Sequence, residues 1–186
     1  LKQVAAGGHT IGSHTWGHVD LAKKQPQEFR DEIEKGFSAV RAAVGADISP
    51  FFRFPMLKLP PDAIAYLGER NIGIFSIDVD YFDFKTKKTE DVIKNVMSKL
   101  EKKGKGIVLM HDLQKSTAQA LPQLLAELNT AGYRVVQIKA AKPLATLPEY
   151  DAPIMAELKG GAGGAGGANG RSIEGIVRKV SEAAPR

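Results

Sequence analysis

Short apolar runs alternate along this sequence with longer segments in which apolar residues recur every three to four positions. The longer segments predict amphipathic helices at Pro26–Val44, Thr89–Lys103 and Ser116–Ala131, and Pro60–Arg70 predicts a shorter one. The apolar runs predict strands at His9–Ile11, Phe51–Phe54, Ile72–Ile77, Gly106–Met110 and Tyr133–Ile138. Because strands that alternate with helices are joined as parallel strands by right-handed crossovers, we expect an α/β fold, either layered or a barrel.

The length and composition predict one folded domain followed by a tail. The chain has 186 residues, of which 43% are hydrophobic, and this is enough to bury one core. The alternation of strands and helices stops at Leu147, Gly160–Gly170 is a flexible Gly/Ala linker, and Ser172–Val180 has the pattern of a short helix. We therefore expect a domain at residues 1–147 and a Gly/Ala-rich flexible tail at residues 148–186.

The composition excludes several kinds of site. The chain has no cysteine, so it has no disulfides, no thiolate zinc site and no cysteine nucleophile, and a metal site must use histidines and carboxylates. No apolar run approaches the ~18 residues of a membrane span. Leu1–Val4 does not begin a signal peptide, and without an initiator Met the chain need not start where its gene does.

The chain is basic, with a formal net charge of +5. Much of the excess lies in Lys85–Lys105, where eight lysines fall on and around a predicted helix. A basic balance is typical of proteins that bind nucleic acid or anionic surfaces. Because neither arginine nor aromatic residues are interleaved with these lysines, we favour a solvated helix face and expect no nucleic-acid partner.

Residues with ligating or acid–base chemistry follow four of the predicted strands, and strand ends carry the active sites of α/β proteins. His14 and His18 follow the first strand, and their spacing puts two imidazoles on one face of a helical turn, where both reach one cation. Arg53 follows the second strand and can pair with a carboxylate. Three aspartates follow the third strand within Asp78–Asp83, and His111 follows the fourth, where an imidazole suits acid–base work.

Each of these signals has a plainer interpretation when it is taken alone. Two histidines at this spacing are often incidental, an arginine is often a surface residue, and a histidine can merely cap a strand. Their arrangement at successive strand ends is more specific. It predicts that the four groups converge on one pocket.

Four segments resemble, in order, the motifs of the polysaccharide deacetylases, the NodB-like domain of carbohydrate esterase family four. Ser13–His18 is similar to the metal-binding histidine motif of that family, and Arg53–Met56 to its Arg-x-Pro-aromatic motif. Asp80–Phe84 is similar to its Asp-x-x-Asp-Trp motif and Leu109–His111 to its Leu-x-His motif. The resemblance covers roughly residues 1–136 and implies a distorted (β/α) barrel.

The chain departs from the family pattern at three places. Met56 replaces an aromatic residue, which matters little where only the backbone N–H is used, and Phe84 replaces a tryptophan but keeps an aromatic wall. The Thr-Phe-Asp-Asp motif, which supplies the family's catalytic base and one metal ligand, is absent. We therefore expect a fragment whose barrel is incomplete at the N-terminus.

The resemblance implies a metal-dependent hydrolase that removes N-acetyl or O-acetyl groups from a polysaccharide or oligosaccharide. His14 and His18 would bind a divalent metal, with zinc the first choice and cobalt or nickel as alternatives. His111 would protonate the departing amine, Asp80 would orient His111, and Arg53 would position the absent aspartate base.

The resemblance also implies substrate contacts. The Met56 N–H would stabilise the oxyanion, Leu109 would line a pocket for the acetyl methyl group, and Phe84 would form the aromatic wall. The partner implied is an acetylated glycan, and relatives suggest the bacterial envelope or secretion as the location. The sequence leaves the sugar polymer and the oligomeric state open.

Three other functions stay open at this level. The chain could be an inactive relative that binds metal or carbohydrate, because the Asp-Asp motif is absent. It could be an amidase for small nitrogen compounds, which uses the same barrel. Nucleic-acid binding by the lysine-rich helix would show a steep dependence on salt.

Overall fold

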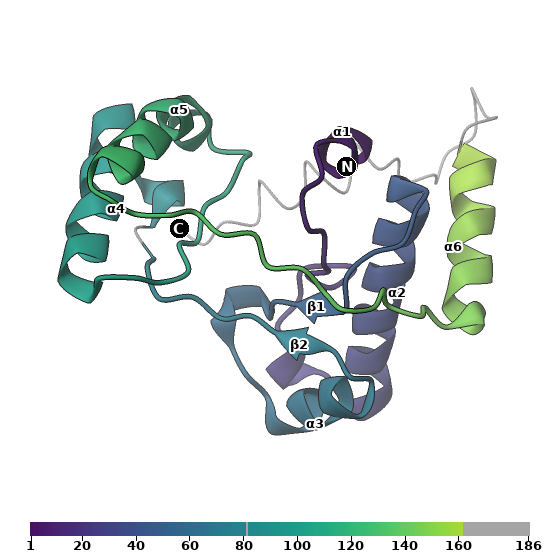
Figure 1. Cartoon of the computed structure of the whole chain (residues 1–186). Coiled ribbons are helices and arrows are strands. Elements are labelled where there is room, and N and C mark those ends of the chain that lie inside the picture. The colour runs from purple at the N-terminus through teal and green to yellow at the C-terminus, as the bar shows by residue number, and fades with distance from the viewer. Residues whose placement is uncertain (81, 162–186) are drawn as a thin grey trace. The chain divides into compact units, whose positions relative to one another are not determined.

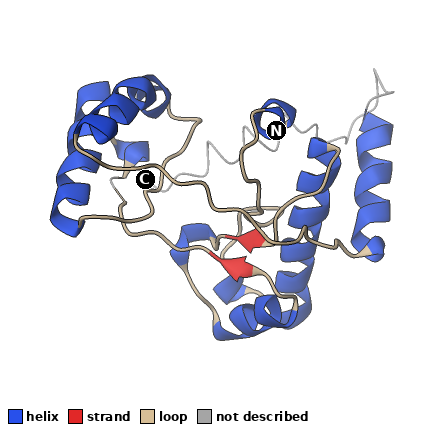
Figure 2. Ribbon diagram, in the orientation of Figure 1, coloured by secondary structure: helices blue, strands red, loops and turns tan. Residues whose placement is uncertain are grey.

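The computed structural model describes residues 1–80 and 82–161 (Figure 1). Two short strands, β1 (Phe51–Phe52) and β2 (Gly73–Ile74), pair in parallel among helices (Figure 2). The helices are α1 (Lys2–Ala6), α2 (Pro26–Val44), α3 (Pro61–Glu69), α4 (Thr89–Lys103), α5 (Lys115–Thr130) and α6 (Pro148–Gly161), with 3-10 turns η1 (Leu21–Lys23), η2 (Pro55–Leu57) and η3 (Asp83–Lys85). None of the helices in the described part of the chain has the length and apolar character needed to cross a membrane.

The described residues form two compact units. The first contains Leu1–Phe75 and the segment from Gln137 onward, and the second contains Ser76–Val136. Each unit has its own hydrophobic core.

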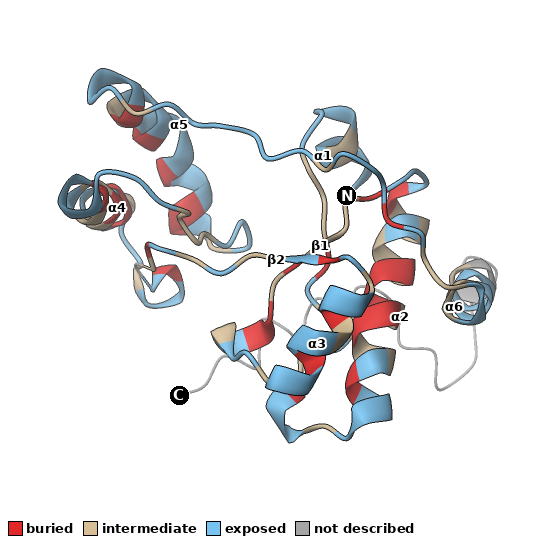
Figure 3. Ribbon diagram, turned by 60° about the horizontal axis from the view of Figure 1, so that its bottom comes forward, coloured by how far each residue is buried: buried red, intermediate tan, exposed pale blue. Residues whose placement is uncertain are grey.

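Helix α2 is central to the first unit and confirms the helix predicted from its apolar spacing. Gln25 and Glu28 form a capping box at its start, and Gly45 ends it with φ 74°, a left-handed conformation that suits glycine. Its buried face packs on α3 and on residues of and next to β1 (Figure 3). The core residues with the least exposure are Ile33, Phe37, Phe52, Phe54, Ala63 and Leu67.

Helices α4 and α5 form the core of the second unit and confirm two further predicted helices. Glu90 and Asp91 lie in the first turn of α4, where their negative charges interact favourably with the positive end of the helix dipole. Gly104 ends the helix with φ 78°. The apolar faces of the two helices pack on each other and on Val79, which pairs with Val108 in an isolated parallel bridge. The buried residues of these faces are Val92, Ile93, Val96, Leu100, Ala120, Leu124 and Leu128.

Two predicted strands, His9–Ile11 and Tyr133–Ile138, are not strands in the structure, and Gly106–Met110 contributes only one bridge. A strand needs a neighbour whose backbone completes its ladder of hydrogen bonds. Between these two segments, a side chain takes the place of a backbone donor. Thr10 Oγ1 donates to the Ile138 carbonyl at 2.5 Å. Apolar content alone therefore predicted more strands than form.

Helix α6 corrects the predicted tail at its beginning. Pro148 is the first residue of this helix, a position where proline is tolerated, and α6 packs along α2 (Figure 1). Ile154 is buried, and the Tyr150 hydroxyl donates to Asp31 Oδ1 of α2 at 2.8 Å. The folded part of the first unit thus reaches the end of α6. The rest of the predicted linker and the predicted helix at Ser172–Val180 lie outside the described residues.

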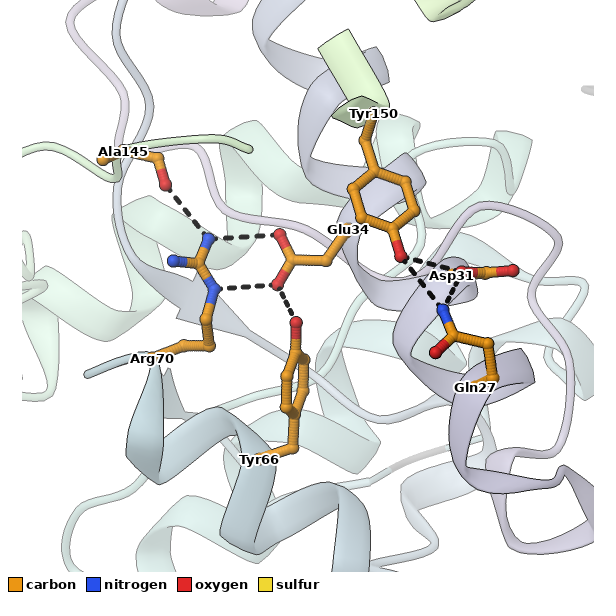
Figure 4. A network of polar contacts seen from close by, with 7 residues as sticks. All are labelled: Gln27, Asp31, Glu34, Tyr66, Arg70, Ala145 and Tyr150. Carbon is orange, nitrogen blue, oxygen red and sulfur yellow. Dashed lines mark hydrogen bonds and ion pairs between the residues drawn. The ribbon is translucent and has the colours of Figure 1, made fainter. Parts of the chain in front are cut away.

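A fully buried carboxylate, Glu34 of α2, joins three segments of the first unit (Figure 4). Arg70 Nε and Nη2 donate to its two oxygens at 2.9 and 3.1 Å, and the Tyr66 hydroxyl donates to it at 2.7 Å. Burial and the bond to Glu34 raise the pKa of Tyr66 above its ordinary value. Arg70 Nη2 also donates to the Ala145 carbonyl at 3.0 Å, which ties the segment before α6 to α3.

Candidate functional site

The histidine motif, residues 13–18, forms a loop that comes between α1 and η1 in the sequence. In space this loop lies between β1 and α2 of the first unit. The Ser13 N–H donates to the Phe51 carbonyl at 2.8 Å, and the Ser13 carbonyl accepts from the Arg53 N–H at 3.1 Å. On the other side of the loop, two backbone N–H groups donate to Glu32 of α2 at 2.9 and 2.7 Å. The loop is therefore fixed by a strand on one side and by a helix on the other.

The structure brings the two histidines together, but not on a helical turn as predicted. Their ring centroids are 4.8 Å apart with an interplanar angle of 71°. Thr15 and His18 have φ values of 68° and 51°, so the backbone enters the left-handed region twice and cannot continue as a helix. Such strained conformations cluster at functional sites.

The histidine pair suits two of the ligand positions of a metal. His14 Nδ1 lies 2.7 Å from the Arg53 carbonyl, an acceptor, so Nδ1 carries the proton and the ring's lone pair is on Nε2. A backbone carbonyl on the second ring nitrogen is a common support for a ligating histidine. Among residues 1–80 and 82–161 no third His, Cys, Asp or Glu joins the pair to make a group of three.

The Arg-x-Pro segment follows β1 directly. Arg53 Nε donates to the Phe75 carbonyl at 3.3 Å, and burial lowers the pKa of the guanidinium. The carboxylate pair predicted for Arg53 is not among the ion pairs of the described residues. Met56 lies in η2 with φ 55° and is 53% exposed, so a second motif also contains a left-handed non-glycine residue.

In the second unit, Asp83 holds His111. Asp83 is 2% exposed, and its Oδ1 lies 2.6 Å from His111 Nδ1. Its Oδ2 accepts the His111 backbone N–H at 2.6 Å and the Thr117 hydroxyl at 3.2 Å. The His111 side chain is 45% exposed, and with Nδ1 bound to the carboxylate its other nitrogen, Nε2, is the one that can exchange a proton with a substrate.

This contact corrects the partner predicted for His111, which was Asp80. Asp80 Oδ1 instead accepts the Phe82 N–H at 2.8 Å and so closes a local turn. The turn buries the side chain of Asp83 and leaves those of Phe82 and Phe84 exposed. The spacing of the aspartates in the sequence does not predict which of them is buried. Thr117 was not predicted to belong to the site, since its residue type and its place in α5 give no signal.

The remaining predicted residues of the second unit flank this pair. Leu109 is partly buried, and its N–H donates to the Val79 carbonyl at 3.0 Å. Phe84 is 42% exposed, one residue after Asp83. The structure thus groups His14, His18, Arg53 and Met56 in the first unit and Asp80, Asp83, Phe84, Leu109 and His111 in the second. Convergence of both groups on one pocket stays a prediction.

The comparisons with known proteins agree on a family. Residues 1–73 match the family model described as polysaccharide deacetylase. Over 141 residues the chain is 34% identical to the peptidoglycan-N-acetylglucosamine deacetylase PgdA of Listeria monocytogenes. The aligned residues make up 74% of this chain and 28% of PgdA. The chain is 27% identical over 142 residues to a peptidoglycan-N-acetylglucosamine deacetylase of Bacillus cereus, of which it covers 50%. The chain thus spans half the length of these relatives or less.

The solved structures agree on the fold. The Bdellovibrio bacteriovorus peptidoglycan deacetylase Bd3279 superposes with a TM-score of 0.69 and is 37% identical in sequence. The match covers 76% of this chain and 40% of the Bd3279 chain. The Bacillus anthracis protein BA3943, a pseudoenzyme of carbohydrate esterase family four, matches 72% of this chain and 46% of its own with a TM-score of 0.66 and 25% identity. Residues 1–73 therefore match the polysaccharide deacetylase family, and the fold is that of the NodB-like domain of carbohydrate esterase family four.

Proposed function

We propose that the chain is a metal-dependent deacetylase that hydrolyses the N-acetyl groups of N-acetylglucosamine in a glycan, with peptidoglycan as the first candidate. The observation that carries the proposal is the His111 imidazole fixed at Nδ1 by the buried carboxylate of Asp83. The chain is more similar in sequence to the Bdellovibrio deacetylase (37% identity) than to the Bacillus anthracis pseudoenzyme (25% identity). This difference supports an active enzyme over an inactive one.

His111 would act as the general acid. Hydrolysis of an acetamide breaks the C–N bond, forms a C–O bond to water and leaves an amine that must gain a proton. Nε2 of a protonated His111 can give that proton while Asp83 holds the ring and balances its charge. The products are acetate and the free amino sugar.

His14 and His18 would hold a divalent metal, and zinc suits two imidazole ligands. When bound, such an ion lowers the pKa of a water ligand and polarises a carbonyl. By family resemblance, the Met56 N–H would stabilise the oxyanion and Leu109 would contact the acetyl methyl group. Arg53 would position the acidic base of the family's Thr-Phe-Asp-Asp motif, which this sequence lacks.

The direct test is release of acetate from N-acetylated glycans by the complete protein, because this sequence lacks the Thr-Phe-Asp-Asp motif that supplies the family's base and one metal ligand. We expect acetate release that a chelator abolishes and added zinc restores, because the histidines need the ion to act. Activity that survives exhaustive chelation argues against metal dependence. No acetate from peptidoglycan or chitin oligosaccharides, with zinc present, argues for an inactive binding protein.

His14→Ala is expected to weaken zinc binding by about 100-fold or more, since it removes a ligand outright, a larger change than loss of a supporting hydrogen bond. Zinc content after dialysis and calorimetric titration with zinc would measure this without any need for activity. His9→Ala, outside the motif, is the matched control. Equal zinc binding by His14→Ala and His9→Ala would exclude His14 as a ligand.

A further inference from the structure

Helix α2 holds the middle of the histidine motif from one side. The Glu32 backbone carbonyl accepts the Trp16 N–H at 2.9 Å, and Glu32 Oε2 accepts the Gly17 N–H at 2.7 Å. Thr15 and His18, the residues on either side of this pair, both have a positive φ. Such conformations persist in non-glycine residues only when the surrounding structure holds them. The bonds to Glu32 supply part of that hold.

A glycine one turn further along α2 lets the loop approach the helix closely. Glu32 and Gly36 lie four residues apart and therefore on the same face of the helix. A Cβ atom at Gly36 would lie 2.6 Å from the Thr15 carbonyl carbon and 2.9 Å from Ser13 Oγ, which is closer than real Cβ atoms come to other atoms. Because only a residue without a side chain fits there, Gly36 sets the distance between the loop and the helix.

The two histidines are supported from opposite sides of the loop. On the side of β1, the Arg53 carbonyl lies 2.7 Å from His14 Nδ1. On the side of α2, the bonds to Glu32 fix the two residues just before His18. The distance of 4.8 Å between the two ring centroids therefore depends on Glu32 as well as on β1.

We propose that Glu32 and Gly36 are positioning residues that set the affinity of the histidine pair for a divalent metal. This inference rests on the proposed function, in which His14 and His18 hold that ion. Glu32 acts through the loop and is not itself a ligand, since the part of the chain that the structure describes contains no group of three potential metal ligands. Loss of a group that orients a ligating histidine typically lowers metal affinity by about 10- to 100-fold.

Calorimetric titration of the complete protein with zinc tests the role of Glu32. We expect Glu32→Ala to bind zinc about tenfold more weakly or worse, because the Gly17 N–H loses its acceptor and the loop can relax. Glu32→Gln should stay within about threefold of the wild type, because its amide oxygen can still accept that hydrogen bond. Glu69→Ala, which removes an exposed carboxylate from α3, is the control and should bind zinc as the wild type does.

The melting temperature of the zinc-free protein separates positioning from a general loss of structure. Zinc-free Glu32→Ala should melt close to the wild type, since Glu32 is only partly buried. Equal losses of zinc affinity in Glu32→Ala and Glu32→Gln would show that the carboxylate acts through its charge. That result would overturn the positioning role, and so would a loss of affinity that appears only together with a matching loss of stability.

Gly36→Ala tests the distance between the loop and the helix. Alanine forms helices better than glycine does, so the helix content measured by circular dichroism should be kept. We expect zinc affinity to fall by about tenfold or more, because the new Cβ displaces Thr15 from α2. Gly68→Ala, at a helical glycine of α3 with open space where a Cβ would stand, is the matched control. Equal zinc affinity in Gly36→Ala and Gly68→Ala would overturn the role of Gly36.

The zinc titrations also distinguish failure of this inference from failure of the proposed function. A wild-type protein that binds no zinc would overturn the proposed metal site and this inference with it. Equal zinc binding by the wild type and Glu32→Ala would overturn this inference alone and leave the proposed function standing.

Discussion

His111→Ala in the complete protein is expected to lower kcat for deacetylation by about 100-fold or more, because the departing amine loses its proton donor. Zinc binding should stay at the wild-type level, since the ligands proposed for the metal are His14 and His18. Steady-state acetate release and zinc content, measured on the same preparation, check both statements. Turnover within a few-fold of the wild type would remove His111 from the mechanism.

Two aspartate variants separate a positioning role from a general loss of structure. Asp83→Asn should lower kcat by at least about tenfold with little change in KM, because Asp83 orients the imidazole and does not touch the substrate. Asp80→Asn should lower kcat less, since its Oδ1 contacts a backbone N–H and not His111. Asp112→Asn, an exposed neighbour of His111, is the control. A larger loss in Asp80→Asn than in Asp83→Asn would restore the partner predicted from the sequence.

Glu34→Ala is expected to destabilise the protein by about 3–5 kcal/mol, the usual cost of removing one partner of a buried ion pair. The change leaves the Arg70 guanidinium, which is 20% exposed at the side chain, without its carboxylate. It also leaves the Tyr66 hydroxyl without its acceptor. Urea denaturation followed by circular dichroism gives the free energy of unfolding.

The exposed residue Glu69 of α3 offers a matched control for this loss. Glu69→Ala should change the free energy of unfolding by no more than about 0.5 kcal/mol, as is usual for surface substitutions. A Glu34→Ala protein as stable as Glu69→Ala would show that the buried network contributes nothing to stability.

The helices and the order of the motifs could be predicted because they depend on local patterns. Apolar residues at three-to-four spacing define α2 and α4 regardless of what packs on them. Strands were less predictable, since Tyr133–Ile138 has strand composition but pairs with no strand in the described part of the chain. Helix α6 was missed because Pro148 and Pro153 interrupt its pattern, while contacts made far away in the sequence stabilise it.

The candidate site was predictable in residue type but not in pairing. The sequence places an acidic cluster and His111 at strand ends, yet the choice between Asp80 and Asp83 depends on the left-handed turn at Phe82. In the same way, His14 and His18 meet through a strained loop and not through helical spacing. Positive φ values at non-glycine residues have no signature in a single sequence.

The most direct test of the central claim is a count of free amines against acetate released when the complete protein acts on an N-acetylated glycan. Hydrolysis of an N-acetyl group frees both products together, so we expect them in equal amounts, and both should fall in step in His111→Ala. Acetate without new amines would identify an esterase acting on O-acetyl groups. Absence of both products from every glycan tested with the complete protein, with zinc present, would contradict the proposed deacetylase function.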